Sequence, residues 1–331
     1  MTPGGNTLPR AALVVAVLLV AAMLLSLVVG AYPLAIGKLL SGHLNEAEWS
    51  VLTQLRAPRV IAACAGGAAF ALAGAALQAL FRNPLADPGL LGVPAAAGLG
   101  AAIALIVVGA GAALWIGALI GAGVAIAGML LVVHRGAAPM AGGTVTLLLL
   151  GIAINAACAA GLALLTALAS EGQLKTLSFW MLGSFASLDW PVVIAMVVCT
   201  ALGGVALGVQ ANALAALALG ERAARTVGVN VQQLRVRVAL ITAAMVAVIT
   251  AFCGGVGFVG LAAPHIARLA AGSSPRVVLP LATLIGALLC VLADVIARSI
   301  APPIELPVGA ITAVLGVPLL VSLVTRRVER A

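Results

Sequence analysis

Apolar residues in this chain form long continuous runs rather than short alternating segments. The first run, residues 8–29, would be about 33 Å long as a helix, enough to cross a hydrocarbon core of about 30 Å. Such runs recur along the whole chain, which predicts an all-α polytopic membrane protein with about ten transmembrane helices in one domain, residues 1–331. A β-barrel would instead show short segments of alternating hydrophobicity. The predicted spans are 8–29, 59–81, 89–109, 112–133, 143–169, 191–210, 233–254, 261–271, 277–300 and 307–326.

The eighth predicted span, residues 261–271, is too short to cross a membrane alone, and glycines precede it. Broken helices persist in membranes where protein or a water-filled cavity covers their free backbone groups, so we expect a partly re-entrant segment. Residues 56–92 and 235–272 share a pattern of arginines, a small-residue helix and a turn, which predicts an inverted-repeat-like core. The predicted hinge or gate residues are Asn83, Pro84, Pro88, Gly254, Gly255, Gly257 and Pro264.

Composition and charge support a membrane location. Hydrophobic residues make up 64% of the chain and charged residues 8%, with a mean hydropathy of +1.26, more apolar surface than a soluble domain can cover. The net charge of +8 does not indicate nucleic-acid binding, because the arginines lie at span ends and only 3% of residues are aromatic. With the N-terminus inside, twelve basic residues fall on the inner side and five on the outer, so both termini are expected in the cytoplasm. The outer five are Lys38, Arg56, Arg59, Lys175 and Arg298, and the inner twelve include Arg135 and Arg330.

The polar residues inside the spans predict no catalytic, cofactor or metal site. The five cysteines form no CxxC pair, and His43, His134 and His265 are scattered. His265 follows Pro264 and is expected to cap or flex the broken segment. Residues 255–260 match GxGxxG, but no acidic residue follows at the distance a dinucleotide site needs. No GxxxxGK[ST] occurs, so ATP hydrolysis would belong to another polypeptide.

Asp294 and Arg298 lie four residues apart near the outer end of the ninth span, so we expect them to pair on one helix face. No acidic residue lies clearly at mid-membrane, which disfavours an ion-coupled carrier working alone. Two other functional classes remain as alternatives to an ATP-driven importer. One is an ion-coupled carrier, which would transport without ATP, and the other is a passive channel or structural subunit.

Residues 210–237 interrupt the apolar pattern with a basic, helix-forming loop. Glu221, Arg222 and Arg225 lie between two spans, with Gly228 and Asn230 as turn signals. A basic helical loop on the inner side of a membrane indicates a docking surface for a soluble partner.

Five segments carry a family resemblance. They are RAPRVIAACAGGAAFALAGAALQALFRNPLADPGLLGV at 56–93, SFWMLGSFASLDW at 178–190, LALGERAARTVGVNV at 217–231, GGVGFVGLAAPHIARL at 254–269, and LADVIAR followed by ELPVGAITAVLGVPLL at 292–320. Over residues 10–328 the chain resembles the FecCD-type permeases. These are the membrane subunits of type II ATP-binding-cassette importers for iron chelates, haem and cobalamin.

The resemblance implies a homodimer in the bacterial inner membrane, with ten spans per subunit and the substrate path along the dimer axis. It also implies two cytoplasmic ATPase subunits, a periplasmic substrate-binding protein and no cofactor. The implied substrate is an iron chelate, haem or a ferric siderophore, moved by alternating access, with cobalamin as the alternative. In the cobalamin importer, outward-facing arginines contact glutamates of the binding protein. The resemblance matches these arginines to Arg56, Arg59 and Arg298. The ATPases are expected at the loop 211–232, on Leu219, Gly220, Glu221, Arg222, Arg225, Thr226, Gly228 and Val229.

Overall fold

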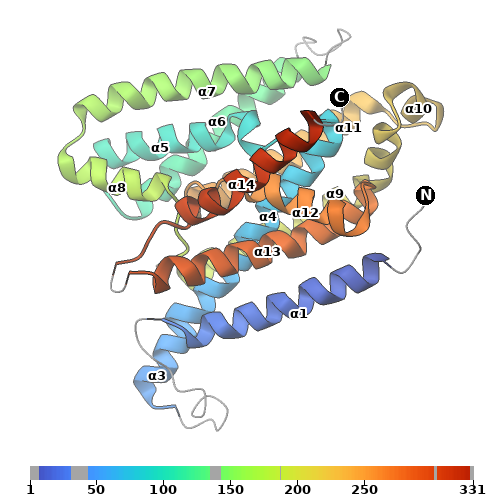
Figure 1. Cartoon of the computed structure of the whole chain (residues 1–331). Coiled ribbons are helices and arrows are strands. Elements are labelled where there is room, and N and C mark those ends of the chain that lie inside the picture. Colours follow the sequence, from blue (N-terminus) through green and yellow to red (C-terminus); the bar gives the residue numbers. More distant parts are fainter. Residues whose placement is uncertain (1–6, 31–43, 135–142, 187, 302–303, 329–331) are drawn as a thin grey trace.

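The computed structural model describes residues 7–30, 44–134, 143–186, 188–301 and 304–328. Within them every regular element is a helix and no strand occurs, so the predicted all-α fold is confirmed (Figure 1). Lys38, Arg135 and Arg330 of the charge count, and His43, lie outside these residues.

A helix occupies each of the ten predicted ranges. Among the described residues, seven helical segments are long and apolar enough to cross a membrane, and three shorter apolar ones, Val93–Val107, Val259–Ala271 and Val308–Pro318, accompany them. The elements are α1 (Thr7–Val28), α3 (Glu46–Ser50), the π-helical η1 (Val51–Arg56), α4 (Ala57–Phe81), the 3-10 helix η2 (Pro88–Leu91), α5 (Val93–Val107), α6 (Ala112–His134), α7 (Gly143–Leu168), α8 (Glu171–Met181), α9 (Trp190–Ala218), α10 (Glu221–Thr226), α11 (Val231–Cys253), α12 (Val259–Ala271), α13 (Pro275–Ser299) and α14 (Val308–Val328).

Helix α4 is the central helix of the bundle. Almost all of its apolar stretch is buried, whereas α1 and α9 lie at the periphery and expose most of theirs, as lipid-facing helices do. The predicted span began at residue 59, but α3, η1 and α4 join into one helix from Glu46 to Phe81. Asn45 and Glu48 start it with a reciprocal capping box, and residues 46–57 contain no glycine or proline to end it.

Glycines allow neighbouring backbones to approach closely. A Cβ on Gly67 of α4 would lie 2.2 Å from the carbonyl oxygen of Gly286 on α13, and one on Gly74 would lie 2.0 Å from that of Gly260 on α12. A Cβ on Gly117 of α6 would lie 2.4 Å from the backbone oxygen of Gly100 on α5. Small-residue faces therefore hold α4 against α12 and α13, and α6 against α5, as is typical of helix packing in lipid.

The helical conformation is interrupted between α11 and α12, where Gly254 and Phe258 have φ values of 71° and 66°. Neighbouring linkers cover the break: the amide of Ser184 donates to the carbonyl of Cys253 at 2.9 Å. A Cβ on Gly254 would lie 1.8 Å from the carbonyl oxygen of Trp180. The segment after the break, α12, is only about 20 Å long and packs against α4, α13 and α14.

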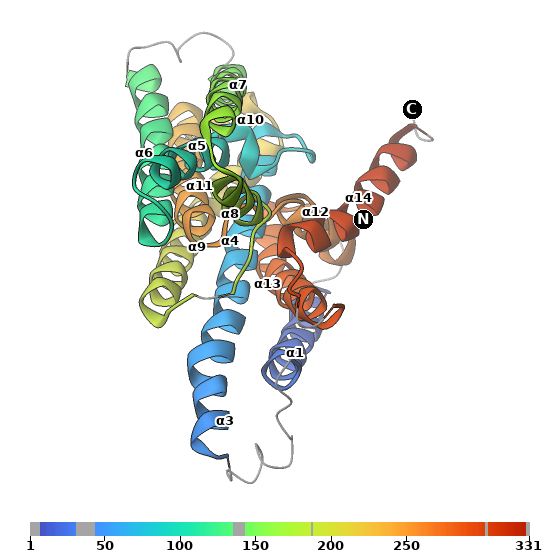
Figure 2. The ribbon, with the colours of Figure 1, turned by 90° about the vertical axis from the view of Figure 1, so that its left-hand side faces the viewer.

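The helices give the bundle two distinguishable ends. The first turn of α1 and the short helix α10 lie toward the right of Figure 1, and α8 lies at the left (Figure 1). Figure 2 looks onto the left-hand side, and in this view α3 reaches below the other helices. We call these the α10 end and the α8 end.

Candidate functional site

The connection between α9 and α11 forms a separate short helix at the α10 end. Helix α9 continues to Ala218 rather than to residue 210, and Gly220, with φ 123°, turns the chain into α10. Gly228, with φ 83°, turns it out again, and Asn230 caps α11 by accepting a hydrogen bond from the amide of Gln233 at 3.0 Å. The predicted turn residues therefore mark the end of a projecting helix.

Helix α10 and its flanks expose apolar as well as basic side chains. Leu219 is 81% exposed and Val227 69% exposed, next to the exposed Arg222 and Arg225. Ala224 is fully buried on the opposite face and seats the helix on the bundle. Apolar side chains exposed among cations are typical of a protein-binding surface. Val227 is not among the predicted site residues, and its one sequence signal is its place directly before a turn glycine.

Glu221 holds α10 to the next helix. Its carboxylate pairs closely with Arg235 of α11 and lies 3.5 Å from Arg225 one turn along α10. The guanidinium group of Arg222 has no ionic or hydrogen-bonded partner among the described residues. The helix is thus pinned at one carboxylate and presents its remaining positive charge outward.

An ionic cluster lies at the α8 end. Asp294, which is fully buried, accepts hydrogen bonds from Nε of Arg59 at 2.9 and 3.1 Å, and Nε of Arg298 lies 3.8 Å from the same carboxylate. The predicted pair of Asp294 and Arg298 is confirmed, and Arg59 from α4 joins it. Nη1 of Arg59 also donates to Glu305 at 2.8 Å, and the Glu305 side chain is 47% exposed.

Arginines of the same region hold the end of α1. Nη1 of Arg56 donates to the carbonyls of Leu27 and Val28 at 2.6 and 2.7 Å, and Nη2 of Arg298 donates to the hydroxyl of Ser26 at 2.6 Å and to its carbonyl. These contacts satisfy carbonyls that the last turn of a helix leaves open. Arg56, Arg59 and Arg298, the predicted docking residues, therefore lie together, with guanidinium groups turned toward partners within the chain.

The turn between α4 and α5 contains the first predicted hinge residues. Oδ1 of Asn83 accepts a hydrogen bond from the amide of Leu85 at 3.0 Å, and Oδ1 of Asp87 accepts one from the amide of Gly89 at 2.8 Å. Burial raises the pKa of the Asp87 carboxyl, while the bond from Gly89 lowers it. A Cβ on Gly260 would lie 2.7 Å from Cδ of Pro88, so this turn packs on the start of α12, beside the second predicted hinge segment.

Gln78 connects α4 to both ends of α12. Its Nε2 donates to the carbonyl of Gly260 at 3.0 Å, and its Oε1 accepts from Nη1 of Arg268 at 2.7 Å. Arg82 and Arg268 line a cavity of about 420 Å³ at the α10 end. In the described part of the chain, no three His, Cys, Asp or Glu side chains gather in a way that could hold a metal ion.

Comparison with known proteins decides the family. The FecCD transport family model matches residues 18–326. This chain belongs to the FecCD transport family. It is 37% identical over 325 residues to the hemin transport system permease protein HmuU of Yersinia pestis, covering 95% of each chain. It is 39% identical over 315 residues to the vitamin B12 import system permease protein BtuC of Salmonella paratyphi A, covering 93% of each.

A solved structure supports the same fold. It is described as an inward-facing metal-chelate type ABC transporter, and it superposes with a TM-score of 0.86 at 30% identity, covering 96% of this chain and 99% of its own. The protein is therefore a FecCD permease, a multi-pass membrane subunit of an ABC importer for metal chelates, haem or vitamin B12. A FecCD permease is not itself an enzyme: its importer includes a separate ATPase and a substrate-binding protein.

Proposed function

We propose that this permease carries an iron chelate, haem or a ferric siderophore, from periplasm to cytoplasm across a bacterial inner membrane by alternating access. The match to the hemin permease over 95% of both chains supports haem. The similarity to the vitamin B12 permease supports cobalamin equally well, so cobalamin is the second candidate. Both termini lie in the cytoplasm in this proposal, as the excess of arginines on that side favours.

The working unit in this proposal is a homodimer with two ATPase subunits, which dock on the loop 211–232. The observation that supports this surface is the projecting α10, with exposed Leu219 and Val227 beside Arg222 and Arg225. Apolar contact would supply affinity, and the cations would fix register. On this basis Val227 joins the residues predicted from sequence.

The proposed cycle begins when ATP binding by the partner draws the two α10 helices together. The hinges would be Asn83–Pro88 and Gly254–Pro264, which flank the ends of α4 and α12. The contact of Pro88 with Gly260, and the bonds of Gln78 to Gly260 and Arg268, support a coupled movement of these two segments. These contacts would transmit a displacement of one segment to the other because both segments are tightly packed.

The substrate is tested in proteoliposomes that contain the permease, its ATPase and its binding protein. We expect ATP-dependent uptake of haemin or of a ferric siderophore, with cyanocobalamin excluded. Uptake of cyanocobalamin instead would establish the second candidate, and uptake of any of them without ATP would contradict an ABC importer.

The binding protein is proposed to dock at the α8 end on Arg56, Arg59 and Arg298. Arg56 and Arg298 are only 5% and 7% exposed and hold α1, so they would act by shaping the surface. Arg59 would make the direct contact, exchanging the half-exposed Glu305 for a carboxylate of the partner. Cations at such a surface raise the association rate of an acidic partner and fix its register.

If Arg59 exchanges Glu305 for a carboxylate of the binding protein, the Glu305→Gln variant should bind that protein more tightly. Removing this internal competitor frees Nη1 of Arg59, and we expect binding-protein affinity to rise roughly two- to fivefold at low salt. The gain should shrink in 0.5 M salt, because exposed charges are then screened within about 4 Å. Surface plasmon resonance on the reconstituted permease measures it. An affinity that is unchanged at low salt would return Arg59 to a purely structural role.

A further inference from the structure

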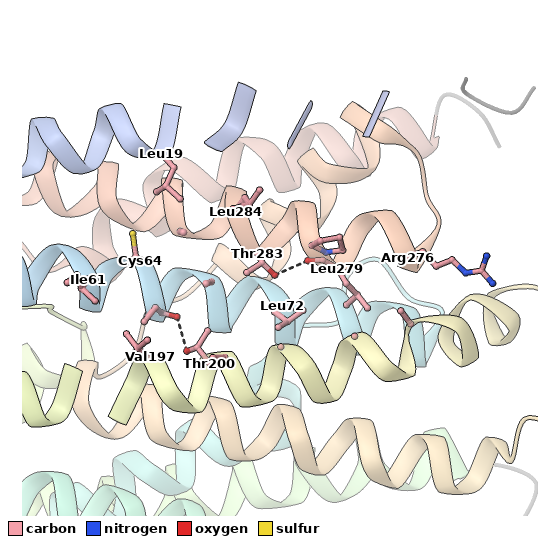
Figure 3. A pocket seen from close by; sticks show the side chains of 18 of the residues that line it. Leu19, Ile61, Cys64, Leu72, Val197, Thr200, Arg276, Leu279, Thr283 and Leu284 are labelled. Atoms are coloured by element: carbon pink, nitrogen blue, oxygen red, sulfur yellow. Dashed lines mark hydrogen bonds between the residues drawn. The ribbon is translucent and has the colours of Figure 1, made fainter. Parts of the chain in front are cut away.

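A long groove runs along the side of the bundle between the peripheral helices α1 and α9. Its floor is formed by α4 and α13, and its volume is about 780 Å³ (Figure 3). Side chains of Leu19, Ile61, Leu72, Val197 and Leu284 line it, so its walls are apolar. Nothing in the proposed transport cycle uses this groove.

The groove is about as long as one membrane leaflet. It follows α4 from Ile61 to Leu72 and α13 from Ala287 to Arg276, eleven residue steps on each helix or about 17 Å, and it follows α9 from Val197 to Asn212, fifteen steps or about 22 Å. Half of a hydrocarbon core of about 30 Å is roughly 15 Å. An apolar groove of this length matches an extended acyl chain of one leaflet.

The two threonine hydroxyls inside the groove have partners already. Thr283 donates its hydroxyl proton to the carbonyl of Leu279 at 2.8 Å, and Thr200 donates to the carbonyl of Ala65 at 3.3 Å (Figure 3). No polar substrate is needed to satisfy them. Gly204 and Gly208 of α9 carry no side chains, so the α9 wall of the groove leaves open space there. A Cβ on Gly208 would meet no heavy atom within 4 Å.

The groove is polar at one end only, the α10 end. Arg276, on the first turn of α13, lies there and points away from the apolar side chains (Figure 3). Asn212, near the last residues of α9, also lines the groove. No described residue forms an ion pair or hydrogen bond with the guanidinium group of Arg276. An apolar channel of one-leaflet length that ends at a free cation matches an acyl chain joined to an anionic headgroup.

We propose that this groove binds an anionic phospholipid of the leaflet at the α10 end, with an acyl chain along α4 and the phosphate at Arg276. The bound lipid fills the space between α1 and α9 and so stabilises the packing of α1, whose only other anchors named above are at the α8 end. This proposal depends on the protein being a membrane protein and not on which substrate it carries.

Lipid retention tests the proposal in the full chain purified with its ATPase in mild detergent. Phosphatidylglycerol and phosphatidylcholine are supplied in equal amounts, and bound lipid is counted by native mass spectrometry. Gly208→Leu should fill the groove and reduce retained lipid at least fivefold. The matched control is Gly123→Leu on the exposed face of α6, where a Cβ also meets nothing within 4 Å and the groove is not involved. It should retain lipid as the unaltered chain does.

The Arg276→Gln variant tests the contact with the lipid headgroup separately from the contact with the acyl chain. The variant should keep a lipid but lose roughly fivefold of its preference for phosphatidylglycerol over phosphatidylcholine. Equal retention in Gly208→Leu and the unaltered chain would overturn the groove as a lipid site. A preference that survives in Arg276→Gln would overturn the assignment of the phosphate to this residue. A change of oligomeric state in Gly208→Leu with lipid retention unchanged would point to a protein contact and also contradict the proposal.

Discussion

Replacing Asp294 by asparagine is expected to destabilise the permease more than any other single charge change at the α8 end. The carboxylate is fully buried between Arg59 and Arg298, whose side chains are 11% and 6% exposed. Asparagine keeps the volume but leaves Arg298 without a counter-charge and Arg59 with only the half-exposed Glu305. Removing one partner of a buried ion pair costs about 3–5 kcal/mol, because the remaining charge stays desolvated. Thermal unfolding in detergent should shift down by roughly 10 °C.

Glu305→Gln is the matched control, because it removes a carboxylate from the same arginine at a half-exposed position. Exposed ion pairs contribute about 0–1 kcal/mol, so the melting temperature should change little. The triple variant Arg59→Met, Asp294→Leu, Arg298→Met should recover most of the loss, since apolar residues often replace a buried ionic group without cost. A melting temperature for Asp294→Asn equal to that of Glu305→Gln would show that the cluster does not hold the α8 end together.

This cluster shows where sequence reasoning succeeds and where it stops. The spacing of Asp294 and Arg298 is local, so their pairing follows from helix geometry alone. Arg59 reaches the same carboxylate from 235 residues away, and Arg56 reaches α1 across 28 residues. Such contacts depend on how the helices pack, which no period in the sequence records. The sequence therefore grouped Arg56, Arg59 and Arg298 on one side and paired Arg298 with Asp294, but it did not predict the partners of Arg56 and Arg59.

The helices themselves were largely predictable because apolar runs of membrane length leave few alternatives. Their ends were less so. Hydropathy falls at Gln210, but helix α9 continues beyond it because the alanines and leucines that follow are strong helix formers. The helix ends only before Gly220. The same extension places α10 farther out and exposes Leu219 and Val227. The residues expected at the ATPase surface from the family resemblance therefore include Leu219 but not Val227.

The second large effect is expected at α10. Replacing Glu221–Gly228 by a Gly/Ser linker of equal length should abolish co-purification of the ATPase while the helices still insert. The linker removes the helix that holds Arg222 and Arg225 in place, the Glu221 anchor to Arg235 and the exposed Val227. Stoichiometry of the purified complex measures the loss, and the thermal unfolding of the isolated permease shows whether the fold survives. Retained ATPase in the linker variant would contradict the assignment of this surface.

A smaller change separates contact from helix formation. Leu219→Ser with Val227→Ser leaves the backbone of α10 and its Glu221 anchor in place, yet removes both exposed apolar groups. If these side chains lie at the centre of the interface, ATPase affinity should fall at least tenfold, because a few buried anchors carry most of the binding energy. Leu269→Ser is the matched control, since Leu269 is 67% exposed on the last turn of α12 and outside the loop. An equal loss of affinity in the control would show that the effect comes from the membrane-facing surface in general and not from α10.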